Sequence, residues 1–308
     1  MALMLEPQPG LAAAIEPPRL LPPEAASLFA ARARRFERLA EGHALGDWLR
    51  FLGRLSGAQH AALQAFPVVR LPAESALVQA RDFGMPPLHA QSWTRDRAWR
   101  DALRQLAQRL ADDAPEASRS SLRLITRLPE DRLEALADQV LATEYYGPDA
   151  ALLPFVAAAL EVYWTAMAAR LGHDGIAPLD VPGICPACGF LPVASVVRTG
   201  TGIANLRYLH CSLCNTEWNL VRVKCPACDG TAKISYRHVE GSDIRNLPAV
   251  RAETCDDCMS YLKILFQEKA PEADPVADDL ATLALDMLVD EAGYSRAGPN
   301  LLFVPGGS

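Results

Sequence analysis

The chain has 308 residues and a mass of 33.4 kDa, with 50% hydrophobic residues, 22% charged residues and a formal net charge of −7 at pH 7. This length predicts more than one domain, and the composition can bury a sizeable core, which excludes wholesale disorder. The negative charge disfavours a protein that coats nucleic acid electrostatically. All eight cysteines lie between Cys185 and Cys258.

The N-terminal part of the chain predicts an all-α domain over residues 1–180, with an extended proline-rich arm at its start. The first residues carry no basic stretch before an apolar one, so we expect no secretory or twin-arginine signal and a cytoplasmic location. Prolines recur through 6–23 and disfavour a helix there. Apolar residues then recur at helical spacing, and no alternating strand pattern of useful length appears before residue 180. The predicted helices cover 28–39, 44–66, 92–112, 129–143 and 148–171.

The most apolar stretch, 150–170, is long enough to resemble a membrane span. Pro154 and Glu161 interrupt it, and a span needs about 20 apolar residues without a central carboxylate. We therefore expect a buried helix of a bundle and a protein that does not span a membrane.

Beyond residue 180 the sequence changes to short strand-like segments that lie near cysteines. Their β-branched and aromatic residues are typical of strands in small metal-binding ribbons. The segments are 193–198, 218–223, 234–239 and 261–266. After Pro271 a helical pattern returns over 276–292, and its apolar face predicts packing against a neighbouring domain.

The eight cysteines form four Cys-x-x-Cys pairs. Such a turn places two sulfurs at adjacent corners of a tetrahedral metal site, and two turns complete a site of four cysteines. Gaps of 22, 10 and 26 residues separate the pairs. Each long gap has room for a strand, a turn and a returning strand, with turns expected at 199–202 and 240–243, whereas the short gap suits a linker.

The spacing therefore predicts two metal sites, each made of consecutive pairs. Site one takes Cys185, Cys188, Cys211 and Cys214, and site two takes Cys225, Cys228, Cys255 and Cys258. An interleaved arrangement, in which the first pair joins the third, is an alternative. Redox-active dithiols are disfavoured, because such a motif usually comes singly at a helix start in a βαβ unit. His210 and His238 are not expected to be ligands, because four cysteines already complete each site.

The predicted fold class is a multidomain α+β protein. The all-α domain (1–180) precedes two tandem rubredoxin- or zinc-ribbon-like modules of four cysteines each, at 181–221 and 222–270. A C-terminal helix and tail occupy 271–308. Four thiolates suit zinc and also a rubredoxin-type iron, so the residues alone leave the metal open.

An enzymatic function is poorly supported by the sequence. A site closed by four cysteines leaves no open position for a catalytic metal. The chain also lacks a phosphate-binding glycine loop, Gly-x-Ser-x-Gly and His-Glu-x-x-His. We therefore expect a protein that is not an enzyme and that serves in protein binding or one-electron chemistry.

Zinc ribbons often bind nucleic acid, and the local charge tests that alternative. Residues 181–270 contain ten Lys/Arg and eight Asp/Glu. Eight thiolates and two divalent ions bring the charge of this segment to about −2, without the basic stripe that nucleic-acid binding needs. A zinc-ribbon nucleic-acid-binding protein and a rubredoxin-type electron-transfer protein remain alternatives, but no nucleic-acid partner is expected.

One segment resembles a known family. Residues 210–225, HCSLCNTEWNLVRVKC, closely resemble the FdhE family, accessory proteins of respiratory formate dehydrogenases. Further matches lie at 86–88, 93–99, 185–189 and 278–283, whereas the tail at 298–303 departs from the family's ending.

The resemblance implies a cytoplasmic, chaperone-like maturation factor without catalytic activity. Its implied partner is the catalytic subunit of a respiratory formate dehydrogenase, bound before twin-arginine export. The resemblance also implies rubredoxin-like sites at the eight cysteines and favours iron, with zinc possible; a homodimer is compatible with it.

Overall fold

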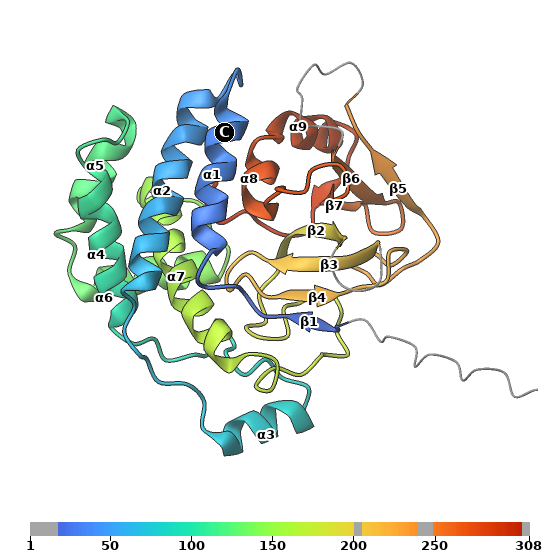
Figure 1. Ribbon diagram of the computed structural model, residues 1–308, viewed down its shortest axis with the longest axis horizontal. Helices are drawn as coiled ribbons and strands as arrows, with labels where there is room; N and C mark the ends of the chain where they lie inside the picture. Colours follow the sequence, from blue (N-terminus) through green and yellow to red (C-terminus); the bar gives the residue numbers. More distant parts are fainter. Residues whose placement is uncertain (1–17, 200–204, 240–248, 304–308) are drawn as a thin grey trace, which may run out of the picture.

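The computed structural model of the chain describes residues 18–199, 205–239 and 249–303. Within these residues a layer of helices packs beside a mixed β-sheet (Figure 1). The predicted fold class is confirmed: a helical N-terminal part precedes two cysteine modules and C-terminal helices. The predicted turn at 240–243, most of the turn at 199–202 and residues 6–17 of the arm lie outside the described residues.

Seven α-helices of the described residues precede the cysteine modules. They are α1 (Leu28–Ala40), α2 (Gly46–Gln64), α3 (Glu74–Asp82), α4 (Ala98–Leu110), α5 (Glu116–Ile125), α6 (Glu130–Leu141) and α7 (Leu153–Leu171). The 3-10 turn η1 (Ala150–Leu152) leads into α7. The sequence did not predict α3 and α5. They have only 9 and 10 residues, too few turns to show a clear helical period.

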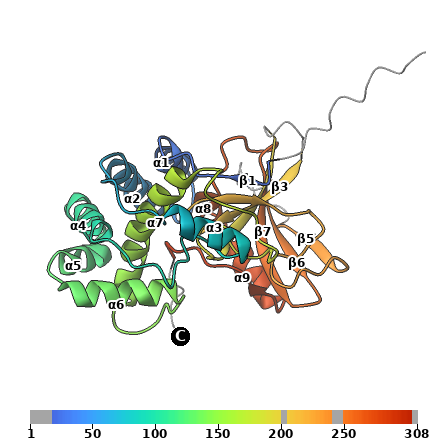
Figure 2. The same cartoon turned by 90° about the horizontal axis from the view of Figure 1, so that it is seen from below.

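Helix α7 is the central helix of this layer and contacts α2, α4 and α6. It lies between the outer helices and the sheet (Figure 2). Every residue from Phe155 to Ala168 is buried. By length and composition the segment Ala150–Leu171 could cross a membrane, but 78% of its most apolar window is buried inside the fold. The prediction of a buried bundle helix is therefore confirmed.

The strands of both cysteine modules belong to one sheet. They are β1 (Leu20–Leu21), β2 (Pro192–Arg198), β3 (Leu206–Cys211), β4 (Glu217–Asn219), β5 (Ile234–Arg237), β6 (Val250–Cys255), β7 (Ser260–Phe266) and β8 (Ser295–Arg296). Their order is β1-β4-β3-β2-β7-β6-β5, and β8 also pairs with β7. Strands β2 and β7 run parallel, with Ser195 opposite Ile264. This pairing joins the two modules.

Two predicted elements differ from the structure. The end of the N-terminal arm is not merely extended, because Leu20 pairs with Trp218 and adds β1 to the edge of the sheet. The helix predicted over 276–292 is two helices, α8 (Pro275–Leu280) and α9 (Leu283–Glu291). Between them the Thr282 hydroxyl donates to the carbonyl of Asp278 at 2.8 Å, a local bond that competes with helix continuation.

Helix α8 connects the two layers. It contacts α1 on one side and β2 on the other. The Arg35 guanidinium of α1 donates to both carboxylate oxygens of Asp278, at 2.9 and 2.5 Å, and both side chains are buried. A bidentate contact of this kind fixes the orientation of α8 relative to α1. The predicted packing of the C-terminal helical segment on a neighbouring domain is confirmed.

Candidate metal centres

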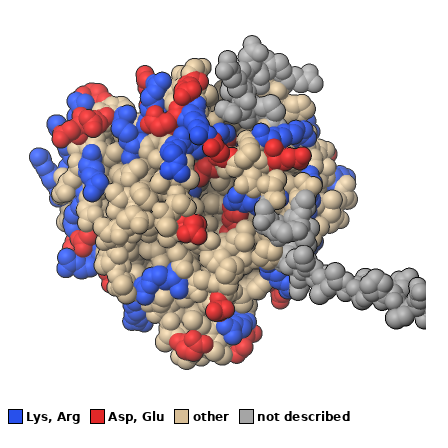
Figure 3. All heavy atoms as spheres, in the orientation of Figure 1, with Lys and Arg blue, Asp and Glu red and all other residues tan. Residues whose placement is uncertain are grey.

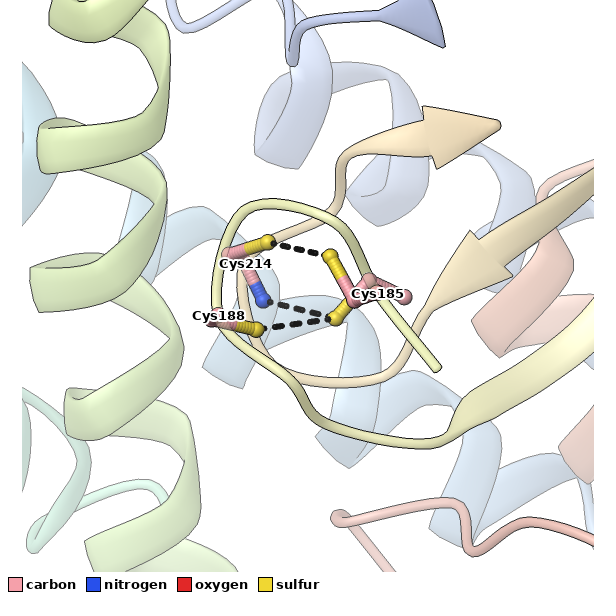
Figure 4. A group of neighbouring side chains, drawn as sticks. Cys185, Cys188 and Cys214 are labelled. Atoms are coloured by element: carbon pink, nitrogen blue, oxygen red, sulfur yellow. Dashed lines mark hydrogen bonds between the residues drawn. The ribbon is translucent and has the colours of Figure 1, made fainter. Parts of the chain in front are cut away.

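The first cluster, called site one, is made of Cys185, Cys188, Cys211 and Cys214. Its four sulfurs lie within 4.8 Å of one another, and all four residues are buried. The Sγ atoms of Cys185 and Cys214 are 3.5 Å apart (Figure 4). Those of Cys188 and Cys211 are also 3.5 Å apart. The cysteines therefore face a common centre that suits a tetrahedral ion. The interleaved alternative does not occur, because consecutive pairs come together.

The second cluster, called site two, has the same plan. Its members are Cys225, Cys228, Cys255 and Cys258, again with sulfurs within 4.8 Å of one another. The Sγ atoms of Cys225 and Cys258 are 3.7 Å apart, and those of Cys228 and Cys255 are 3.8 Å apart. Here only Cys225 and Cys255 are buried, whereas Cys228 and Cys258 are exposed.

All four Cys-x-x-Cys turns share one backbone feature. The residue after each pair adopts a positive φ, between 53° and 74°. These residues are Gly189, Asn215, Asp229 and Met259. The left-handed step folds the chain back so that both sulfurs of a pair point to the same side. Backbone hydrogen bonds close these turns, for example from Gly189 N to Cys185 O at 2.8 Å.

Polar hydrogens are directed at the sulfurs of site one. The backbone N–H groups of Leu213 and Cys214 each donate to Cys211 Sγ at 3.4 Å, and the Thr216 hydroxyl lies 3.2 Å from Cys214 Sγ. Bonds of this kind stabilise a thiolate. Burial raises the pKa of the Cys185 and Cys188 thiols, so four ionised sulfurs in this interior need a cation. The residues present therefore fit a metal ion.

The helical layer encloses site one. In the segment 86–90 that follows α3, Leu88 N donates to Ala187 O and Ala90 N to Cys188 O, both at 2.9 Å. The Trp164 indole of α7 in turn donates to Leu88 O at 3.0 Å. The first cysteine turn is thus paired with a strip of the helical domain that is itself held by the central helix.

A buried polar network starts at Asn215, the residue directly after the last cysteine of site one. Its side-chain oxygen accepts a 2.7 Å hydrogen bond from Arg32 of α1, and its amide donates to the Thr165 hydroxyl of α7 at 2.8 Å. Arg32 also pairs with Glu161 at 3.3 Å and with Asp274 at 3.1 Å. Sequence reasoning missed these residues, because nothing local marks a long-range contact.

The two histidines near cysteines belong to neither cluster. His210 is buried, with Nδ1 2.8 Å from Glu217 Oε1 and Nε2 3.0 Å from Asn215 Oδ1. His238 is exposed. Within the described residues, the only clusters of His, Cys, Asp or Glu with metal-site geometry are the two groups of cysteines. Both groups are therefore able to hold an ion without another kind of ligand.

Comparison with known proteins gives consistent matches along the chain. Residues 17–180 match the family described as "FdhE, N-terminal", 184–222 match "FdhE, central domain" and 223–303 match "FdhE, C-terminal domain". The boundaries between these matches fall at the start of the first cysteine module and between the two modules.

Individual relatives agree with the family matches. The chain is 39% identical to a protein FdhE homolog of Serratia proteamaculans over 94% of this chain and 92% of the relative. It is also 39% identical to a protein FdhE homolog of Pseudomonas putida, over 100% and 96%. The crystal structure of the FdhE protein from Pseudomonas aeruginosa superposes with a TM-score of 0.84 at 38% identity, covering 94% of this chain and 100% of that one.

Proposed function

The chain belongs to the FdhE family, and from this membership we propose that it is a cytoplasmic, non-catalytic accessory protein in the maturation of a formate dehydrogenase. Its partner is the catalytic subunit of the respiratory enzyme, which it binds before twin-arginine export. We further propose that residues 1–180, 181–221, 222–270 and 271–308 are the structural units of the chain.

The eight cysteines are proposed to ligate two ions, with iron favoured over zinc. The support is the arrangement of sulfurs in two compact groups, each complete with four cysteines. A bound ion would supply a rigid crosslink and, if it is iron, a one-electron centre. Because no position is left open for substrate, the geometry favours a binding function over hydrolysis or group transfer.

The observation that best supports partner binding is a set of exposed large apolar side chains in α3 and on either side of it in the sequence. This helix has no buried residue, and it projects from the body of the molecule in Figure 1. We call the exposed side chains of Val68, Val78, Phe83 and Met85 the α3 patch; their exposed fractions are 84%, 41%, 75% and 56%. Exposed apolar surface of this kind marks interaction sites, so we propose that the catalytic subunit docks here.

The position of the patch also ties it to site one. Met85 immediately precedes the segment 86–90, whose backbone bonds hold the first cysteine turn. A partner on the α3 patch would therefore contact an element that is rigidly anchored at the metal cluster. On the face shown in Figure 3, basic and acidic side chains are interspersed among uncharged ones, which favours a protein partner over nucleic acid.

Co-purification tests the proposal. Tagged wild type, Phe83→Ser/Met85→Ser and the control Leu124→Ser are expressed with the catalytic subunit of a formate dehydrogenase. Leu124 is 45% exposed on α5 and lies outside the patch. We expect wild type and the control to retain the subunit. The double variant should retain at least about tenfold less of it, because removing apolar side chains from the centre of an interface weakens binding strongly.

Two outcomes would contradict this proposal at different levels. If the double variant retains as much subunit as wild type, the α3 patch is not the docking surface. If the wild-type chain retains no subunit, and also fails to restore formate dehydrogenase activity in a host that lacks its own accessory protein, the proposed function itself is wrong.

A further inference from the structure

The two cysteine clusters differ in their access to solvent. In site one all four cysteines have an exposed fraction of 0%. In site two, Cys225 and Cys255 are 1% exposed, but Cys228 and Cys258 lie open at the surface. One edge of site two is therefore in contact with solvent, and site one has no such edge.

Three elements close site one from different sides. The segment 86–90 pairs with its first cysteine turn, and Trp164 of α7 holds that segment. The second turn is held through Asn215, which contacts both α1 and α7. A ligand from solvent could reach these sulfurs only after the helical layer separates from the sheet, which is an opening of much of the fold.

The surroundings of site two are open by comparison. Residues next to its first turn, Val221 and Val223, are each 58% exposed, and Met259 after its last cysteine is 42% exposed. Its charged neighbours form surface pairs, Lys224 with Asp229 at 2.8 Å and Lys233 with Asp257 at 3.1 Å. Such exposed pairs add little stability, so they do not shield the sulfurs of Cys228 and Cys258 from solvent.

From this asymmetry we propose that the sites have separate roles: site two is the exchange site, whose ion is gained and lost from the folded protein through Cys228 and Cys258, and site one keeps its ion as part of the fold. The proposal rests on the ligand sets given above. It does not depend on which dehydrogenase subunit the protein serves.

The exchange follows from ligand replacement at the exposed edge. An incoming chelating group takes a coordination position as the sulfur of Cys228 or Cys258 leaves and accepts a proton from water; no electron is transferred. Cys255 stays in place within the sheet, because β6 pairs with β5 and β7 through residues up to Cys255. Cys225 lies outside the strands and is held by its turn, in which its backbone N–H donates to the carbonyl of Gly230 at 2.8 Å. The folded apo form of site two is thereby kept ready to bind an ion again.

Metal release from the full-length chain tests the inference. The protein loaded with two zinc ions is mixed with excess EDTA, samples are withdrawn over time, and the zinc left on the protein is measured. We expect the ion of site two to leave at least about a hundredfold faster than the ion of site one, because release from site one requires the fold to open first. Circular dichroism should be unchanged after the fast phase.

Cysteine labelling assigns the phases to residues. N-ethylmaleimide added after the fast phase, followed by peptide mass spectrometry, should modify Cys228 and Cys258 and spare Cys185 and Cys188. The variant Cys228→Ser should lose the fast-released ion and keep the slow one. This variant alters only an exposed ligand, so the folded state is expected to persist, and wild-type labelling gives the same information if it does not.

The inference is overturned if both ions leave at one rate, or if the cysteines of site one are modified first. A chain that loads fewer than two ions contradicts the ligand sets and this inference with them. Failure to bind a formate dehydrogenase subunit would leave the release kinetics unaffected, so the two proposals fail separately.

Discussion

Arg32 in helix α1 donates a 2.7 Å hydrogen bond to the side chain of Asn215, 183 residues further along the chain. Asn215 directly follows Cys214, and both partners of the bond are buried. The helical domain is thereby connected to the turn that presents a sulfur of site one. Loss of this contact from either α1 or the cysteine turn should lower the stability of the fold, because it leaves the buried guanidinium of Arg32 without one of its partners.

The first prediction concerns Asn215→Gly. Glycine tolerates the φ of 58° at this position, so the substitution removes the amide contacts without adding backbone strain. We expect a loss of about 2–4 kcal/mol in the free energy of unfolding, since Arg32 and Thr165 both lose a buried partner. Urea unfolding of the metal-loaded protein measures this loss.

Asp229→Gly is the matched control for that substitution. Asp229 occupies the same position after a cysteine pair in site two and has a φ of 61°, but it is exposed and its side chain forms a surface ion pair with Lys224. We expect a change within about 1 kcal/mol. Equal losses in the two variants would show that the turn, and not the connection to α1, is responsible.

The second prediction concerns the pH dependence of stability at Glu161. Burial raises the pKa of this carboxyl from 4.5 to about 7, opposed by Arg32 and by a hydrogen bond from Gln59. Between these two pH values the unfolded chain releases a proton that the folded chain retains, so stability falls as the pH rises. Glu161→Gln removes this dependence. The stability of the variant relative to wild type should increase from pH 4.5 to 7 by up to about 3 kcal/mol and then level off.

Thermal or urea unfolding at several pH values checks this slope. Ser56→Ala is a suitable control, because Ser56 is a buried uncharged residue of α2, the helix that also carries Gln59. The difference in unfolding free energy between Ser56→Ala and wild type should be the same at every pH. A flat difference between Glu161→Gln and wild type would mean that the carboxyl has the same proton affinity in both states.

The third prediction concerns Gly183, in the linker before the first cysteine turn. A Cβ atom at this position would lie 2.1 Å from the carbonyl oxygen of Pro226, which belongs to the first turn of site two. Gly183→Ala must therefore displace backbone, at a cost of about 1–3 kcal/mol. In Gly57→Ala, by contrast, the new Cβ meets no atom within 4 Å, and alanine favours the helix by about 1 kcal/mol. The two variants should shift the unfolding midpoint in opposite directions.

The cysteine grouping could be predicted from the sequence because it depends on local spacing. A linker of 10 residues between Cys214 and Cys225 is too short for a strand and its return, and the structure indeed groups consecutive pairs. The difference in burial between the sites could not be predicted in this way. It arises from the segment 86–90 and from α7, which contact site one from far away in the sequence.

The strand arrangement shows the same limit. Residues 193–198 and 261–266 have the composition of strands, and β2 and β7 form there. Their parallel pairing, with Ser195 opposite Ile264, has no signal in either segment, because apolar strand residues accept many partners. The sequence therefore predicted two ribbons, but it did not predict that they share one sheet.

The last prediction concerns the connection between those two ribbons. Arg207 of β3 and Glu253 of β6 form an ion pair of 2.9 Å, with side chains 0% and 1% exposed. Burial raises the pKa of Glu253 to about 7, against the attraction of Arg207. Arg207→Met removes the ion-pair partner of this buried carboxylate and leaves only the weaker attraction of Arg222, so we expect a loss of about 3–5 kcal/mol at pH 8. At pH 5.5 the loss should be smaller, because the buried carboxyl can take up a proton.

Glu253→Gln in the Arg207→Met background separates the charge from the packing. The double variant has no buried charge at this position, and we expect it to recover at least about 2 kcal/mol of the loss at pH 8. Urea unfolding of the four proteins of this cycle gives the coupling energy. If the double variant is as unstable as Arg207→Met, the lost stability comes from the hydrogen bonds of Arg207 to Ser195 and to the carbonyl of Lys224, and the ion pair is not what holds the ribbons together.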